Sequence, residues 1–156
     1  LHGGNVTAHS SLAGSRFEVR LPLVDAVAEA PARRWQAQGA GRRVLVIEDN
    51  EDALASMSDM LALDGHVVSG AKDGTVGLNT LLAQRPDVAV VDIGLPGIDG
   101  FQVALQARAS GFAGRMIAVS GYGQEQDARR ALKSGFDAHL VKPVGPDELR
   151  RMLGVQ

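Results

Sequence analysis

The chain has 156 residues, of which 45% are hydrophobic, so it can form a core of ordinary size, which argues against global disorder. Its formal net charge of −2 gives no general reason to expect nucleic acid or a membrane surface as a partner, and the lack of cysteine excludes disulfides, thiolate catalysis and cysteine-ligated metals. No apolar run has the length of a membrane span, and the chain starts at Leu1 without a signal sequence, so we expect a piece of a longer protein.

The N-terminal segment predicts a β-hairpin followed by a linker. Residues 5–10 and 16–21 alternate in polarity, and the serine- and glycine-rich residues 11–15 suit a turn between them. An isolated hairpin is marginal in water, so this one either packs on another surface or has lost its parent sheet. Residues 24–41 are rich in Ala, Gly, Pro and Arg, which indicates a linker.

From residue 42 onward, short apolar runs alternate with segments of helical periodicity, which predicts strands and helices in turn. In chain order we expect a strand at 44–47, a helix closed by residues 64–65, a strand at 67–71, a helix between 73–74 and 85–86, a strand at 88–91, a helix at 101–109, a strand at 116–119, a helix at 125–134, a strand at 138–141 and a helix starting near 146–147. This order predicts an α/β fold, a doubly wound five-stranded parallel sheet of the flavodoxin-like order 2-1-3-4-5.

Four of the predicted strands end at polar residues of different chemical kinds. These residues are Glu48 and Asp49 after the first strand, Asp92 after the third, Ser120 after the fourth and Lys142 after the fifth. Because the carboxyl ends of parallel strands meet in one crevice, we expect these side chains to lie together. Three close carboxylates favour a hard divalent cation, and Mg²⁺ with a phosphoryl group fits this set. Asp92 is the candidate nucleophile, since a carboxylate can form an acyl phosphate.

The other residues of this set have supporting functions. Lys142 supplies a point charge for a phosphoryl group, Ser120 a hydroxyl donor and Gly94 a backbone carbonyl for the metal. An aspartyl-phosphate phosphatase of the haloacid-dehalogenase type would need an acid two residues after the nucleophile, where this chain has Gly94. Each strand-end residue alone is explained equally well as a solvated strand end or a helix cap. The interpretation therefore depends on their joint occurrence in this order.

Residues 42–153 resemble a receiver domain of the two-component response-regulator family. The matching stretches are VLVIEDN at 44–50, VDIGLPGIDG at 91–100, AVSG at 118–121 and LVKP at 140–143. The resemblance implies the following roles: Asp92 as phospho-acceptor, Glu48, Asp49, Asp92 and the Gly94 carbonyl as the Mg²⁺ site (Glu48 mainly through a water), Ser120 as the switch hydroxyl, and Lys142 as a phosphoryl contact before a cis Lys142–Pro143 bond.

One position departs from the family pattern. His139 stands where many members carry a switch Tyr or Phe, so the usual coupling of Ser120 movement to an aromatic side chain is in doubt. His139 is either a switch residue of another kind or an ordinary half-exposed strand residue.

Residues 1–23 resemble the last hairpin of a histidine-kinase ATPase domain, joined by a linker at 24–41 to a receiver at 42–156. This order is characteristic of hybrid histidine kinases, so we expect a sensor histidine kinase as the parent protein. The fragment itself lacks the ATP-binding boxes, and none of its histidines is followed by an acidic residue, so it is not expected to be a kinase. We expect it to take a phosphoryl group from a phosphohistidine in a bacterial phosphorelay. The alternative is a pseudo-receiver that acts only as an interaction or autoinhibitory module.

The expected partners follow from that resemblance. They are a histidine-kinase core, in cis or in trans, or a histidine phosphotransfer protein, with a homodimer as a further option. We expect no nucleic acid partner, no membrane contact by this fragment and a cytoplasmic location, also where the parent is membrane-anchored. Arg129, Arg130 and Lys133 form a basic stripe on the helix predicted at 125–134, which is either a solvated face or a contact for an acidic partner.

Overall fold

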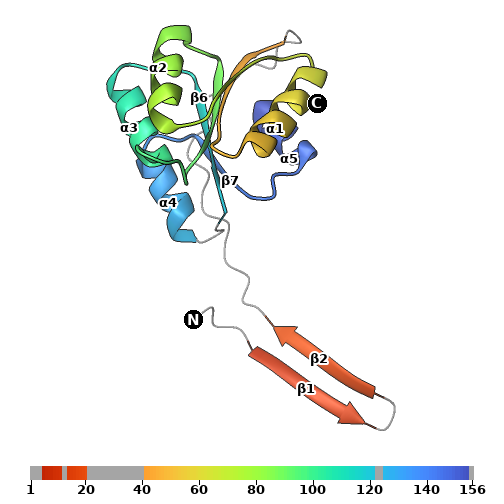
Figure 1. Cartoon of the computed structure of the whole chain (residues 1–156). Helices are drawn as coiled ribbons and strands as arrows, with labels where there is room; N and C mark the ends of the chain where they lie inside the picture. Colours follow the sequence, from red (N-terminus) through yellow and green to blue (C-terminus); the bar gives the residue numbers. More distant parts are fainter. Residues whose placement is uncertain (1–4, 12–13, 21–40, 122–124, 155–156) are drawn as a thin grey trace. The chain divides into compact units, whose positions relative to one another are not determined.

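The computed structural model describes residues 5–11, 14–20, 41–121 and 125–154, and the chain divides into two compact units, Leu1–Arg33 and Arg34–Gln156. In the first unit, strands β1 (Asn5–Ser11) and β2 (Gly14–Arg20) pair antiparallel, so the predicted hairpin is present (Figure 1). Its turn is shorter than the predicted residues 11–15, because Ser11 still pairs with Gly14. The predicted linker, apart from residue 41, lies outside the described residues.

The described residues of the second unit form five strands and five helices in strict alternation, as the sequence predicts. They are β3 (Arg43–Ile47), α1 (Glu51–Leu63), β4 (Val67–Ala71), α2 (Gly74–Gln84), β5 (Val88–Asp92), α3 (Gly100–Ala109), β6 (Arg115–Ser120), α4 (Glu125–Lys133), β7 (Ala138–Val141) and α5 (Pro146–Leu153). The observed bounds differ from the predicted ones only at the ends. Strand β5, for example, includes Asp92, because this residue pairs in register with Val119 of β6.

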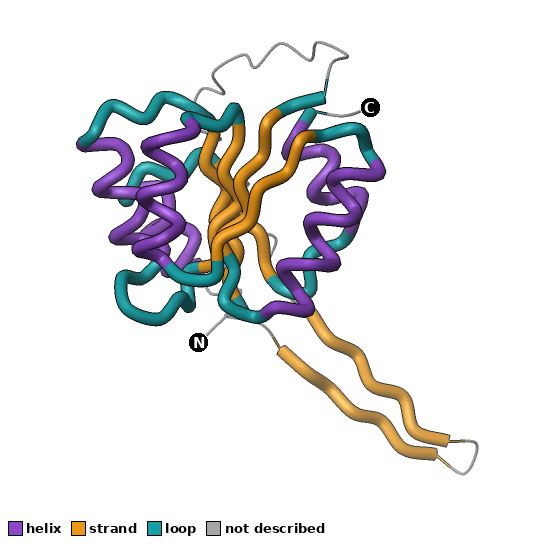
Figure 2. Tube along the Cα trace, turned by 45° about the horizontal axis from the view of Figure 1, so that its top comes forward, coloured by secondary structure: helices purple, strands orange, loops and turns teal. Residues whose placement is uncertain are grey.

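The strands form one parallel sheet in the order β4-β3-β5-β6-β7, which is the predicted order 2-1-3-4-5. Helices α1 and α5 cover one face of this sheet, and α2, α3 and α4 cover the other (Figure 1). Figure 2 shows the resulting three layers, with the sheet between two groups of helices. The strand order reverses between β3 and β5, and ligands of such folds bind beside this point.

The sheet is buried on both faces, which explains why its strands are continuous apolar runs. Alternate residues of each strand point to opposite sides and enter two separate clusters. Toward α2, α3 and α4 the sheet presents Leu45, Ile47, Ala89, Val91 and Ala118, and toward α1 and α5 it presents Val44, Val46, Val88, Val90, Ile117 and Val119. This packing fixes the strands against slippage, because a shift by one residue would exchange the two faces.

Three helices begin at the carboxyl edge of the sheet with side-chain caps. Asn50, Asp73 and Asp99 accept hydrogen bonds from Ala53, Val76 and Gln102 main-chain amides at 2.9, 2.7 and 2.8 Å. Such caps satisfy amides that the helix itself leaves without partners. They therefore fix the connections that follow β3, β4 and β5, where the predicted site residues lie.

At the opposite edge, Arg108 of α3 joins two loops, the one between α3 and β6 and the one between α4 and β7. Its guanidinium donates to the carbonyls of Phe112, Gly114 and Gly135 at 2.8 Å each and to the carboxylate of Asp137 at 2.7 Å. The same Asp137 carboxylate accepts the Met116 amide at 2.8 Å, at the start of β6. Because a guanidinium offers five donors in a rigid plane, one side chain holds the ends of α3 and α4 to the sheet.

Gly100 allows the chain to return closely past the end of β5. A Cβ at Gly100 would lie 2.3 Å from the carbonyl oxygen of Asp92 and 2.8 Å from the Cα of Ile93. Both neighbours are main-chain atoms, so they cannot move aside without displacing the residue that carries the central carboxylate of the predicted site.

We expect Gly100→Ala to lower the free energy of unfolding by about 1–3 kcal/mol, the usual cost of overpacking. Gly121→Ala is the matched control, because a Cβ there meets nothing within 4 Å, and it should change stability by less than about 0.5 kcal/mol. Urea denaturation followed by circular dichroism measures both. Equal stability of the two variants would contradict the close approach described here.

Candidate functional site

Three carboxylates meet where β3 and β5 end. Ligand oxygens of Glu48, Asp49 and Asp92 all lie within 4.8 Å of one another. The parallel pairing of Ile47 with Val91 produces this arrangement, since it puts the residues that follow Ile47 and Val91 side by side. Glu48 and Asp92 are buried and Asp49 is exposed, so the cluster opens to solvent on one side.

Lys142 lies between the two buried carboxylates. Its Nζ donates to Glu48 Oε2 and to Asp92 Oδ2, both at 2.7 Å. Partial burial alone would lower the pKa of Lys142, but the hydrogen bonds and charges of Asp92 and Glu48 outweigh burial and raise that pKa above its usual value. Lys142 is therefore a full positive charge at neutral pH, aimed at the centre of the cluster.

The connections around the cluster are held by the main chain. The amide of Gly94 donates to Asp92 Oδ1 at 3.0 Å, so each oxygen of Asp92 accepts one hydrogen bond. The Lys142–Pro143 peptide bond is cis, which confirms that prediction. The amide of Gly94 thus bonds Asp92, whereas the role of the Gly94 carbonyl as a metal ligand stays a prediction.

Ser120 ends the next strand, β6, and is buried. Its Oγ lies 2.8 Å from Nε2 of His139 on β7, which is a hydrogen bond. Burial lowers the pKa of His139, and the charge of Asp127 on α4 opposes this only in part. The sequence did not predict a direct contact between the two residues. Its structural basis is the pairing of Ala118 with His139, which puts Ser120 and His139 on the same face of the sheet.

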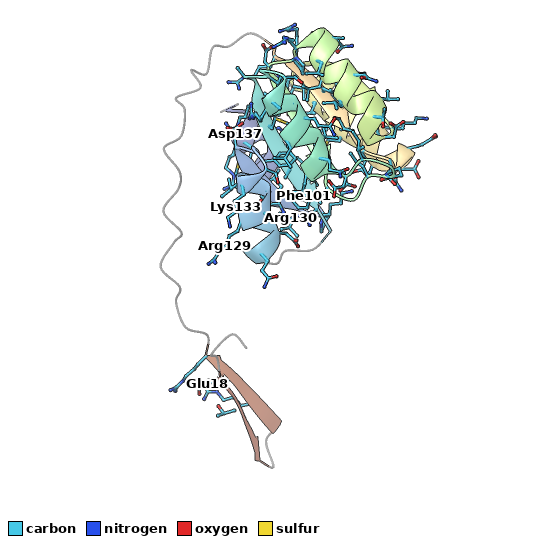
Figure 3. All side chains as sticks on the ribbon, turned by 90° about the vertical axis from the view of Figure 1, so that its left-hand side faces the viewer. Glu18, Phe101, Arg129, Arg130, Lys133 and Asp137 are labelled. Atoms are coloured by element: carbon cyan, nitrogen blue, oxygen red, sulfur yellow. The ribbon has the colours of Figure 1, made fainter. Side chains whose placement is uncertain are left out.

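Helix α4 contacts the start of α3 through a basic side chain. The guanidinium carbon of Arg130 lies 4.0 Å from the centre of the Phe101 ring, and Nη2 lies 4.0 Å from the Asp99 carboxylate. Figure 3 shows Arg129, Arg130 and Lys133 along α4, with Arg130 next to Phe101. At least this member of the predicted basic stripe thus has a partner within the domain, which the sequence pattern did not indicate.

The chemistry available at this crevice follows from its donors. Carboxylate oxygens are common ligands of hard divalent cations. Because Asp49 is exposed, a cation bound here would still be accessible to solvent and to a further ligand. Lys142 supplies a fixed charge for an anionic group bound at Asp92. The crevice therefore combines a nucleophilic carboxylate, oxygen donors for a cation, and a cation of its own.

Comparison with known families agrees with this geometry. The model of the response regulator receiver domain matches residues 44–154. The chain belongs to this family. The matched range covers the parallel sheet of the second unit except for Arg43, so the crevice described above lies within the receiver domain.

Individual relatives agree with this assignment. The transcriptional regulatory protein PrrA of Mycobacterium tuberculosis is 38% identical over 107 residues, which are 69% of this chain and 46% of that protein. The sensor histidine kinase RcsC of Salmonella typhi is 30% identical over 112 residues, which are 72% of this chain but 12% of RcsC. A solved receiver domain protein (CheY-like) from Methanospirillum hungatei has a TM-score of 0.69 and 27% identity, and the match covers 74% of this chain and 92% of that one. The chain thus spans less than half of PrrA or RcsC.

The receiver domain is part of a two-component system, as its family shows. Within the described ranges, no helix combines the length and the apolar character that crossing a bilayer requires. The roles predicted for Glu48, Asp49, Asp92, Ser120 and Lys142 in phosphoryl chemistry stay predictions at this point, although the crevice brings the three acids and the lysine together.

We expect Asp49→Asn to stabilise the receiver domain by about 0.5 kcal/mol when divalent cations are chelated, because it removes one of three mutually repelling charges that water and salt already screen. Asp59→Asn removes an exposed charge from α1 outside the cluster and should have no such effect. Urea denaturation in EDTA measures both variants. A loss of stability in Asp49→Asn would show that the three carboxylates do not repel one another as their distances indicate.

Proposed function

We propose that the receiver domain accepts a phosphoryl group on Asp92 from a phosphohistidine, with Mg²⁺ bound at Glu48, Asp49, Asp92 and the carbonyl of Gly94. The observation that carries this proposal is the position of Lys142, whose ammonium bonds both buried acids of the carboxylate cluster at 2.7 Å. Because the Lys142 ammonium already bonds Asp92, its charge can stabilise an anionic group bound there without a rearrangement of the crevice.

The transfer is a substitution at phosphorus. A carboxylate oxygen of Asp92 forms the new P–O bond, the P–N bond to the donor imidazole breaks, and the imidazole leaves with the electron pair. The charge of the transition state is spread over the three remaining phosphoryl oxygens. Bound Mg²⁺ would supply further charge neutralisation at these oxygens.

The residues around Asp92 perform separate parts of this reaction. The Gly94 amide holds Oδ1 of Asp92, which orients the carboxylate. Lys142 bonds the other oxygen, Oδ2, and its charge attracts the incoming group. Ser120, at the end of the neighbouring strand, offers a hydroxyl to the phosphoryl group once it is in place. Glu48 accepts a hydrogen bond from Lys142 and would contact a bound metal mainly through a water.

The protein context of this domain is also part of the proposal. Residues 1–23 form the last hairpin of a kinase ATPase domain, residues 24–41 link it to the receiver at 42–156, and the parent is a hybrid histidine kinase. Two observations support this: the hairpin belongs to a unit of its own, and RcsC, a sensor histidine kinase, is 30% identical to this chain over 112 residues. The phosphoryl donor is then a kinase core or a histidine phosphotransfer protein, in the cytoplasm.

Incubation with Mg²⁺ and acetyl phosphate should add one phosphoryl group to the protein, detected by intact mass, and Asp92→Asn should abolish the adduct because the acceptor oxygen is lost. Asp59→Asn, outside the crevice, should react like the wild type. An adduct that persists in Asp92→Asn would contradict the assignment of the acceptor. No adduct on the wild-type protein would favour the alternative, a pseudo-receiver that only binds partners or inhibits the kinase.

Calorimetric titration should show Mg²⁺ binding that Asp49→Ala weakens by at least about tenfold, because a direct carboxylate ligand is removed. Asp59→Ala serves as the control and should bind Mg²⁺ like the wild type. An unchanged affinity in Asp49→Ala would remove this residue from the proposed metal site.

A further inference from the structure

The contact between Ser120 and His139 joins the crevice to a titratable side chain. Ser120 is buried at the end of β6, His139 is half-buried on β7, and the Oγ–Nε2 distance of 2.8 Å leaves room for one hydrogen between the two atoms. A phenylalanine ring at position 139 would offer no nitrogen to this hydroxyl. A tyrosine would offer a group that titrates only near about pH 10.

The direction of this hydrogen bond depends on whether Nε2 carries a proton. When Nε2 is bare, it can only accept, so Ser120 must give its hydroxyl proton to His139. When Nε2 is protonated, His139 donates to Oγ, and the hydroxyl proton of Ser120 can point to a different acceptor. The ring therefore determines which way Ser120 donates.

We propose that His139 is a positioning residue for Ser120, and that a phosphoryl group on Asp92 and a proton on His139 favour each other. The proposal rests on the function proposed above. In the phosphorylated state Nε2–H donates to Oγ of Ser120, and the Ser120 hydroxyl donates to a phosphoryl oxygen. In the resting state Ser120 donates to bare Nε2. The proposal assigns the proton of the neutral resting imidazole to Nδ1, so Nε2 becomes a donor when the ring takes up one further proton from solvent.

The charges around His139 are arranged for such coupling. The negative charge of Asp127 acts on the ring from α4, and the neighbour of the ring on β6 is the uncharged Ser120. The charged groups at the nearby strand ends are Asp92, at the end of β5, and Lys142, directly after β7. Burial holds the pKa of His139 below its usual value in the resting domain, so the ring is neutral at pH 7. A phosphoryl group adds negative charge at Asp92. The hydrogen bonds from His139 to Ser120 and from Ser120 to the phosphoryl group are stronger when His139 is protonated, because charge strengthens both bonds.

The sign of the pH dependence follows from linkage. If phosphorylation raises the pKa of His139, the phosphorylated state binds more protons between the lower and the higher pKa. Lowering the pH through this interval then favours the phosphorylated state, and the two effects must be equal in size. Above the higher pKa the ring is neutral in both states, and the coupling is absent.

The test is an NMR titration of the His139 ring in the presence of Mg²⁺, with and without the phosphoryl analogue beryllofluoride. We expect the analogue to raise the pKa of His139 by about one unit, equivalent to tenfold in proton affinity. His139→Phe identifies the resonance by its loss. His66 is the internal control, because its Nδ1 accepts the Arg42 amide at 3.1 Å, at the start of β3, and its pKa should not change.

Two variants separate a positioning role from a general charge effect. In Ser120→Ala the rise in the His139 pKa should fall to less than half, because the connecting hydroxyl is gone. In His139→Phe the affinity for beryllofluoride should lose the roughly tenfold increase that we expect in the wild type on acidification. An equal rise in wild type and Ser120→Ala would overturn the positioning role, since direct attraction between the phosphoryl charge and the ring would then suffice.

The outcomes also distinguish this inference from the proposed function. The fluorine resonances of bound beryllofluoride report occupancy of Asp92 independently of the histidine. If the analogue binds and the pKa of His139 stays constant or falls, the inference is wrong while the proposed function stands. If the analogue does not bind to the wild-type protein with Mg²⁺, the proposed function is overturned and the inference with it.

Discussion

The crevice of this receiver domain depends on one ammonium group between two buried carboxylates. Without a cation between them, Glu48 and Asp92 would repel each other strongly, because both carboxylates are buried. Lys142 offsets this repulsion through two charge-assisted hydrogen bonds of 2.7 Å. Glu48 follows β3 and Lys142 follows β7, and these two strands lie three positions apart in the sheet. The hydrogen bond between Lys142 and Glu48 therefore spans the crevice along the carboxyl edge of the sheet. Three carboxylates and one ammonium leave the crevice with a formal charge of −2, and Asp49 lies on the solvent side, where a metal ion can reach it.

That contact in turn needs the parallel register of the sheet. The pairs Ile47 with Val91 and Asp92 with Val119 bring the strand ends level, and the two apolar clusters on either face hold these pairs in place. The sheet is therefore the rigid part of the site. The residues that respond to a ligand are the ones at or just beyond the strand ends, where hydrogen bonds can change partners without a cost in packing.

Much of this arrangement could be predicted from the sequence because its signals are local. Apolar runs of about the length of a strand, each followed by a polar residue, predicted the strands, the fold class and the residues that meet in the crevice. The contact of Ser120 with His139 was not predicted, because it depends on strand register and side-chain rotation, which no motif specifies. Arg130 was read as part of a charged stripe, whereas it lies on the Phe101 ring. The hairpin turn was predicted too long, because serines suit both a turn and the paired ends of β1 and β2.

Arg108, which joins the loops at the amino edge of the sheet, fixes the C-terminal end of α4. Arg108 bonds Gly135 and Asp137 just after the C-terminal end of α4, whereas the other end of this helix follows the connection from Ser120. If α4 tilts about this end, the displacement of each residue grows with its distance from the Arg108 contacts. For a helix of 9 residues, a tilt of roughly 10° moves the far end by about 2 Å and the held end hardly at all. A displacement of α4 that leaves the Arg108 contacts intact would therefore be largest at the N-terminal end of the helix and smallest near Lys133.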